Sequence, residues 1–130
     1  MKAFFDTNIL VYAQQHGDKA ERSRELLSRG GVISVQVLNE LASVLRKKLG
    51  KNWREIEEVV ADALDLLDPP LPLTLPLHCA ALALARDHNV SLYDALIVAA
   101  AQEARCDILY SEDMQQDRVF GSLKIVNPFA

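Results

Sequence analysis

Short apolar segments alternate with longer amphipathic segments along the chain, and this alternation limits the possible folds more than any other feature. The runs at residues 3–5, 32–33, 107–111 and 123–126 have the length of buried strands. Most of the sequence between them carries apolar residues at steps of three and four, which predicts helices. Short strands separated by helices favour an α/β fold, here a three-layer α/β/α sandwich around a mainly parallel sheet.

Capping and breaking residues give the approximate ends of the helices. We expect Ser34 and Asn52 to cap two of them, because their side chains can accept hydrogen bonds from a first turn. Two prolines in residues 71–76 favour an extended connector or a sheet edge, and residues 112–121 are expected to form a polar loop. Trp53 begins an apolar stripe, so its expected role is packing. The predicted helices cover residues 9–13, 18–29, 37–49, 53–67, 77–87 and about 91–105.

The chain length and charge restrict the class of protein. A sequence of 130 residues fits one domain, residues 1–130, and its 50% hydrophobic content supports a real core. The net charge of −4 excludes a strongly basic nucleic-acid-binding protein, although binding through a metal ion stays open. Two cysteines, Cys79 and Cys106, define no disulfide framework and favour a reducing, cytoplasmic location. We expect neither a signal peptide nor a membrane span.

Two acidic residues follow predicted strands. Asp6 lies at the end of the first strand, and Asp113 lies two residues after Ser111, at the end of a later one. Ligands of open parallel sheets bind beyond the carboxyl ends of the strands, so both residues are candidates for a site. Each also has a structural interpretation, since Asp6 can cap a helix and Asp113 can belong to a polar loop.

Two further acidic residues lie on predicted helices. Glu40 sits at the margin of an apolar stripe, where a carboxylate needs hydrogen-bond donors or a cation, or else must reach solvent. Asp94 has the spacing of a capping box with Ser91, yet a buried-looking run follows it at once. Carboxylates that converge without lysines repel one another unless a divalent ion neutralises them. Oxygen ligands alone favour Mg²⁺ or Mn²⁺ over Zn²⁺.

The chain resembles a PIN-domain nuclease, and in size it resembles the VapC-type toxins of toxin–antitoxin pairs. Four blocks carry this resemblance: Phe5-Asp6-Thr7-Asn8-Ile9-Leu10-Val11-Tyr12, Val37-Leu38-Asn39-Glu40-Leu41, Tyr93-Asp94-Ala95-Leu96-Ile97 and Leu109-Tyr110-Ser111-Glu112-Asp113. The resemblance implies that Asp6, Glu40, Asp94 and Asp113 are the catalytic and metal-binding residues, supported by the Ser111 hydroxyl. The family often has another acidic residue shortly after the fourth. Here Gln115 and Gln116 take that place, and Asp117 is the possible substitute.

The resemblance implies an Mg²⁺- or Mn²⁺-dependent endoribonuclease with an RNA substrate, a cognate antitoxin and a homodimeric state. The alternative is a catalytically weak or inactive PIN-like module that binds RNA or protein, and a nuclease outside toxin–antitoxin pairs is a third possibility. Two groups of basic residues are either solvated helix faces or an RNA-binding track. They are Arg22, Arg24 and Arg29, and Arg46, Lys47, Lys48, Lys51 and Arg54.

Overall fold

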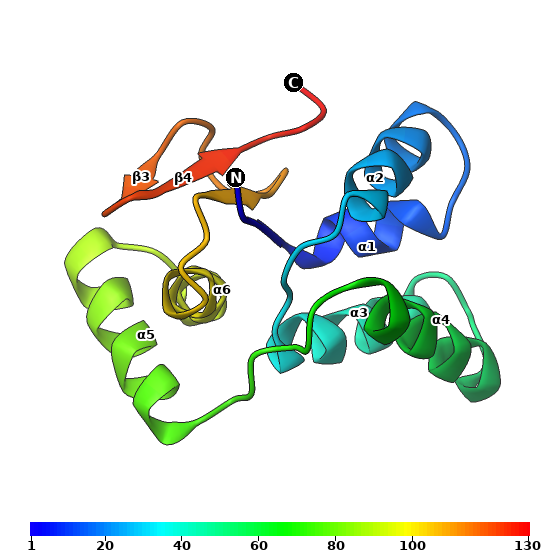
Figure 1. The fold of residues 1–130 in the computed structure, drawn as a ribbon. Coiled ribbons are helices and arrows are strands. Elements are labelled where there is room, and N and C mark those ends of the chain that lie inside the picture. The colour runs from blue at the N-terminus through cyan, green and yellow to red at the C-terminus, as the bar shows by residue number, and fades with distance from the viewer.

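The computed structural model describes all residues from 1 to 130 and contains one four-stranded sheet (Figure 1). Its strands are β1 (Ala3–Phe5), β2 (Ile108–Tyr110), β3 (Val119–Phe120) and β4 (Leu123–Val126), in the order β1-β2-β4-β3. The β1–β2 and β2–β4 pairs are parallel, and only β3 runs antiparallel to β4. The carboxyl ends of β1 and β2 therefore lie side by side, and the segments that follow Phe5 and Tyr110 lie next to each other at the same end of the sheet.

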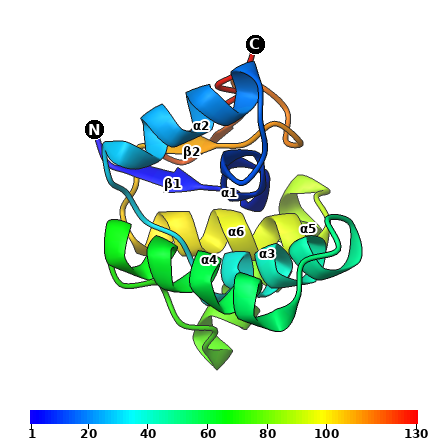
Figure 2. The same cartoon turned by 90° about the vertical axis from the view of Figure 1, so that its right-hand side faces the viewer.

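Six helices surround the sheet in the expected three-layer arrangement. They are α1 (Thr7–Ala13), α2 (Asp18–Ser28), α3 (Val35–Lys47), α4 (Trp53–Leu66), α5 (Leu75–His88) and α6 (Leu92–Glu103). Figure 2 shows α2 on one face of the sheet and α6 on the other, with α3, α4 and α5 on the same side as α6. The predicted α/β sandwich with a mainly parallel sheet is confirmed.

Helix α6 lies at the centre of the hydrophobic core. Every residue from Ala95 to Ala101 is buried, so this helix has no solvent-facing side over two turns. Four of those residues are alanines, and small side chains allow α5 and the sheet to approach the helix closely. The alanines of α6 therefore contribute to packing inside the protein. None of the six helices combines the length and the apolar character needed to cross a membrane.

The predicted caps form as hydrogen bonds. Ser34 Oγ accepts from the backbone N–H of Val37, and Asn52 forms a reciprocal capping box with Glu55. The predicted strand at residues 32–33 is reduced to single bridges, from Val32 to Phe4 and from Ser34 to Leu71. It still extends the sheet beyond β1, because Val32 N–H donates to the Ala3 carbonyl oxygen at 2.9 Å.

Two further expectations differ from the structure. Strand β3 falls inside the predicted polar loop, where a two-residue strand is too short to show an alternating pattern. Trp53 was expected to pack in the core, but its side chain is 60% exposed. The prediction was wrong because Trp53 is the first residue of α4, and Ile56, one turn later, is the buried residue of that helix.

Candidate active site

Asp6 joins the end of β1 to the start of α1. It is only 6% exposed, and its Oδ1 accepts a hydrogen bond from the Thr7 backbone N–H at 2.7 Å. Its Oδ2 accepts from Ser111 Oγ, also at 2.7 Å. Burial is the main reason that the pKa of Asp6 is raised to about 6; the two hydrogen bonds oppose this rise, and the charges of Glu40 and Asp113 contribute to it. Asp6 is thus both the expected helix cap and a buried carboxylate with acidic neighbours.

Glu40 reaches from α3 to the start of α1. Its Oε2 accepts from Thr7 Oγ1 at 2.7 Å, and its Oε1 accepts from Gln36 Nε2 at 2.9 Å. Thr7 therefore binds two carboxylates at once, Asp6 through its backbone and Glu40 through its hydroxyl. Of the alternatives for Glu40, the structure shows hydrogen bonds to neutral donors rather than an ion pair.

Asp113 and Asp94 complete the acidic group. Asp113 is exposed after β2, and its Oδ2 accepts from Asn8 Nδ2 at 3.0 Å. Asp94 lies in the first turn of α6, where its backbone N–H donates to Ser91 Oγ at 3.1 Å. Burial raises the pKa of Asp94, and the charges of Asp113 and Glu40 also raise it. Since Glu40 and Asp113 act on both Asp6 and Asp94, the structure brings the four predicted residues into one electrostatic group.

Two adjoining clefts give solvent access to this group. Glu40 and Asp113 line a cleft of about 390 Å³ together with Tyr12 and Lys48. Asp113 also lines a second cleft, of about 230 Å³, which contains Asp94. Asp113 thus belongs to the walls of both clefts, and a ligand beside it can approach carboxylates from either side.

The four carboxylates have no basic partner, since none of them takes part in an ion pair of this protein. Their protein hydrogen-bond donors are hydroxyls, amides and backbone N–H groups, which leaves the negative charge uncompensated. Asn8 Oδ1 is buried beside them without a hydrogen-bond partner. Carboxylate and amide oxygens are ligands that suit Mg²⁺ or Mn²⁺.

The arrangement also limits how such an ion could bind. No three side chains of the types His, Cys, Asp and Glu are grouped closely enough to hold an ion directly. Mg²⁺ keeps several of its waters and commonly uses only one or two carboxylates. The residues present therefore fit a largely hydrated divalent ion better than an ion enclosed by protein ligands.

Asp117 is not brought to the site. It has a left-handed backbone conformation, with φ of 66°, and its Oδ1 lies 3.3 Å from Lys124 Nζ. It lines neither acidic cleft. The possible substitute for the missing family acid is instead part of a surface ion pair.

Of the residues that hold the carboxylates, the sequence analysis named only Ser111, whose hydroxyl donates to Asp6. Gln36 lies one helical turn before Glu40, and this spacing could have identified it. No pattern indicated the contacts of Glu112, which accepts hydrogen bonds from Tyr12 Oη at 2.5 Å and from Lys19 Nζ. The Lys19 ammonium also lies 5.5 Å from the ring centroid of Phe129. Through these contacts α1, α2, the loop after β2 and the C-terminal segment are held together beside the cleft that contains Glu40 and Asp113.

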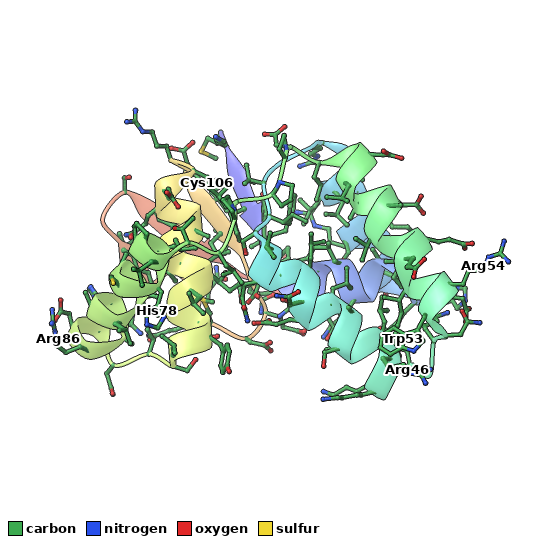
Figure 3. The ribbon with its side chains drawn as sticks, turned by 90° about the horizontal axis from the view of Figure 1, so that it is seen from below. Arg46, Trp53, Arg54, His78, Arg86 and Cys106 are labelled. Atoms are coloured by element: carbon green, nitrogen blue, oxygen red, sulfur yellow. The ribbon has the colours of Figure 1, made fainter.

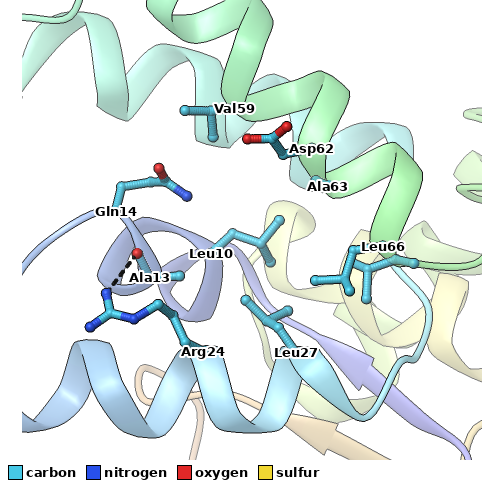
Figure 4. Close-up of a pocket in the computed structure, with 10 residues that line it drawn as sticks. Leu10, Ala13, Gln14, Arg24, Leu27, Val59, Asp62, Ala63 and Leu66 are labelled. Carbon is cyan, nitrogen blue, oxygen red and sulfur yellow. Dashed lines mark hydrogen bonds between the residues drawn. The ribbon is translucent and has the colours of Figure 1, made fainter.

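A separate, apolar cleft of about 300 Å³ lies between α1, α2 and α4 (Figure 4). Leu10, Leu27 and Leu66 are among the residues that line it, and Arg24 and Asp62 contribute charge. The Arg24 guanidinium is fixed there, because Nη1 donates to the Ala13 carbonyl oxygen at 3.0 Å. This cleft contains none of the four carboxylates.

Comparison with known proteins identifies the family. The model of the PIN domain matches residues 3–121, and the chain belongs to this family. No curated protein matches the sequence.

Solved structures share the fold at low sequence identity. A toxin–antitoxin complex from Klebsiella pneumoniae has a TM-score of 0.74 at 22% identity, covering 98% of each chain. VapC20 of Mycobacterium tuberculosis, described as a sarcin–ricin loop cleaving toxin, has a TM-score of 0.72 at 21% identity, covering 86% of this chain and 90% of that chain. VapBC2 from Rickettsia felis, bound to a DNA fragment from its promoter, has a TM-score of 0.70 at 22% identity, covering 96% and 97%. These structures show that the chain has the fold of such toxins.

Proposed function

We propose that this PIN-domain protein is an Mg²⁺- or Mn²⁺-dependent endoribonuclease and the toxin component of a toxin–antitoxin pair. The observation that carries the proposal is the group of four carboxylates without any basic partner, three of which line two adjoining clefts. Without a cation this group would repel a phosphodiester, whereas a divalent ion reverses the local field. The shared fold with toxins of this kind supports the same function.

Each of the four residues has a role in this proposal. Asp6, Glu40, Asp94 and Asp113 would hold the ion, directly or through its waters. A bound divalent ion would lower the pKa of a water molecule and stabilise charge on the attacking and leaving oxygens. Asp113 is the candidate to accept the proton of the attacking water, because it is exposed and lines both clefts. The attack would be in line, without a covalent enzyme intermediate.

An RNA cleavage assay tests the proposal. We expect purified protein to cut labelled single-stranded or structured RNA in Mn²⁺ or Mg²⁺ and not in EDTA. Asp94→Asn is expected to lower the rate about 100-fold or more, since it removes one of the charges that hold the ion. Asp117→Asn is the matched control and should retain the rate, because Asp117 pairs with Lys124.

Other results of this assay would contradict the proposal. Cleavage in EDTA, or full activity of Asp94→Asn, would exclude the metal-dependent site. RNA or Mn²⁺ binding without cleavage would favour the inactive PIN-like binding module. That alternative is supported by Gln115 and Gln116, which stand where the family often has another acidic residue.

The Thr7 hydroxyl is expected to position Glu40 for the ion. Thr7→Val keeps the side-chain shape but removes the donor that lies 2.7 Å from Glu40 Oε2. Residues that orient metal ligands typically change metal affinity about 10- to 100-fold when they are replaced. Calorimetric Mn²⁺ titration should show a reduction in this range for Thr7→Val and near-normal affinity for Thr7→Ser, which keeps the hydroxyl. Equal affinities of the two variants would exclude this role.

We also propose a cognate antitoxin as partner and a cytoplasmic location. The apolar cleft between α1, α2 and α4 supports the partner, because it offers apolar surface on the same helix that begins beside Asp6. A partner seated there could extend a basic side chain toward the carboxylates. Co-purification with the product of an adjacent reading frame would test this partner. The free cysteines, Cys79 and Cys106, support a reducing compartment.

The homodimer is a further proposal. Helix α5 supports it, because Leu75 and Leu82 on this helix are 74% and 48% exposed and α5 packs mainly against α6. Exposed apolar side chains of this size indicate a surface that can be covered by another copy. Sedimentation equilibrium of the purified protein measures the stoichiometry, and a monomer at all concentrations would exclude the dimer.

A further inference from the structure

One short segment concentrates positive charge in an otherwise acidic chain. Residues 46–54, Arg-Lys-Lys-Leu-Gly-Lys-Asn-Trp-Arg, contain five basic residues and no acidic one, while the net charge of the whole chain is −4. The segment contains the end of α3 and the start of α4, with a short turn between them. We call residues 46–54 the basic corner.

The chain's single tryptophan is displayed at this corner. The Trp53 side chain is 60% exposed, and the Arg46 guanidinium lies over its ring at 5.0 Å from the centroid. Arg46 is itself fixed, because Nη1 donates to the Lys51 carbonyl oxygen at 3.1 Å. Figure 3 shows Arg46 and Trp53 together at one end of the molecule, with Arg54 close by. An exposed indole held by a guanidinium offers a flat surface on which a nucleic-acid base can stack.

Of the five basic residues of the corner, two lysines have no acidic partner. Two other residues do have one: Lys51 Nζ lies 4.0 Å from Glu55 Oε2, and Arg54 Nε lies 3.6 Å from Glu58 Oε1. Lys47 and Lys48 form no ion pair and are exposed. Free lysines on a surface are suited to contact phosphates.

The basic corner continues into the acidic cleft. The acidic cleft here is the one of about 390 Å³ that contains Glu40 and Asp113. Lys48 and Leu49 also line it, so the positive surface ends where the carboxylates begin. A chain of phosphates that crosses the corner can therefore pass directly to the site. A partner protein with an acidic segment would also suit the charge, but it would leave the stacking surface and the acidic cleft unexplained.

We propose that the basic corner binds single-stranded RNA, with an unpaired base stacked on Trp53 and phosphates at Lys47 and Lys48, and leads that strand into the acidic cleft. Stacking on Trp53 requires a base with a free face, which a continuous duplex does not offer. The inference rests on the proposed nuclease function and specifies its substrate as RNA with an unpaired base near the cleavage position.

Trp53 provides a direct test, because its fluorescence is the only tryptophan signal of the protein. The full chain is titrated in EDTA with a single-stranded oligoribonucleotide, with the same strand in a duplex, and with polyglutamate. We expect strong quenching by the single strand and little by the other two. Equal quenching by the duplex, no quenching by either RNA, or equal quenching by polyglutamate would overturn the inference, the last in favour of a protein partner.

The binding surface is located by comparing the RNA affinities of variants, measured by the fluorescence anisotropy of labelled RNA. Trp53→Leu should bind about 10-fold more weakly, and Trp53→Phe should retain most of the affinity because it can still stack. Lys47→Ala with Lys48→Ala should reduce the slope of log affinity against log salt by about 1.4, because each phosphate that a lysine neutralises on a single strand contributes about 0.7. Arg86→Ala is the matched control, since Arg86 lies at the opposite end of the molecule (Figure 3). Circular dichroism checks that all variants are folded.

The results separate this inference from the proposed function. Binding is measured in EDTA, so quenching by single-stranded RNA would support the basic corner even if Mn²⁺ produced no cleavage. Metal-dependent cleavage together with normal RNA affinity of Trp53→Leu would support the nuclease and overturn the role of this corner. A decrease of affinity in Arg86→Ala as large as that in the lysine variant would also overturn it, because the effect would then reflect net charge alone.

Discussion

Asp6→Asn is expected to stabilise the metal-free protein while it abolishes the response to divalent ions. The pKa of Asp6 is about 6, above the ordinary value of 3.8, mainly because the carboxyl is buried. This difference corresponds to about 3 kcal/mol of destabilisation when the group is ionised, an upper limit because the fold can relax. Asparagine can keep the hydrogen bond from Thr7 N–H to Oδ1, and a bond in which its Nδ2 donates to Ser111 Oγ can replace the one that Ser111 donates to Asp6.

The pH dependence gives this prediction its sign. Between pH 3.8 and about 6 the folded state holds the Asp6 proton more tightly than the unfolded state does. The contribution of Asp6 to stability therefore falls as the pH rises through this window, and the full cost is present above pH 6. The advantage of Asp6→Asn should be about 1 to 3 kcal/mol at pH 7.5 and should vanish below about pH 4.

Urea unfolding in EDTA at both pH values measures this difference. Mn²⁺ should then raise the stability of the wild type and leave the variant unchanged, because an ion that binds only the folded state stabilises it. A variant that is less stable than the wild type in EDTA at pH 7.5 would mean that the Asp6 charge is already compensated. In that case Asp6 would need no cation to balance its charge.

Gly31→Ala is expected to destabilise the fold by about 3 kcal/mol or more. Gly31 has φ of +151°, and an added Cβ would lie 2.5 Å from Phe5 Cε2 and 2.8 Å from the Ala3 carbonyl oxygen. That carbonyl cannot move away freely, because it accepts the Val32 N–H at 2.9 Å. Backbone strain and overpacking each cost about 1 to 3 kcal/mol.

Gly30→Ala is the matched control for this change. Gly30 also has positive φ, +82°, but nothing lies within 4 Å of the position of an added Cβ. Its cost should be about 1 kcal/mol, from the backbone conformation alone. Urea unfolding of both variants measures the difference, and similar destabilisation of the two would show that the approach of Gly31 to β1 contributes little.

The sequence was sufficient for the architecture because the relevant signals are local. Alternating apolar segments indicate the strands and helices, and Ser34, Asn52 and Ser91 each form the expected cap with a residue three positions later. Strand β3 was not predicted, because two residues are too few to show the alternation of apolar and polar side chains that indicates a strand. The position of Trp53 was predicted wrongly because an apolar stripe does not reveal where the contact between two helices ends.

The four acidic residues were predicted from the sequence, whereas the groups that form hydrogen bonds with them were mostly not predicted. Their candidacy follows from local position, at the ends of strands, at the start of a helix or, for Glu40, at the margin of an apolar stripe, and from the resemblance to PIN-domain nucleases. The bonds from Thr7 to Glu40 and from Asn8 to Asp113 join residues 33 and 105 positions apart, and a single sequence contains no direct sign of such pairs. Asp117 was a candidate only as a substitute for the further acidic residue that the family often has, and a left-handed turn places it against Lys124 instead.

The parallel pairing of β1 with β2 has a consequence for how the protein is made. Phe4 and Phe5 are synthesised more than 100 residues before their strand partners, Leu109 and Tyr110. Pairings between such distant parts of a chain form slowly, and apolar strands that wait for them are prone to aggregate or to be held by chaperones. The same delay applies to the acidic group, because Asp113 is synthesised more than 100 residues after Asp6. A nascent chain that has not reached residue 113 therefore lacks the complete acidic group.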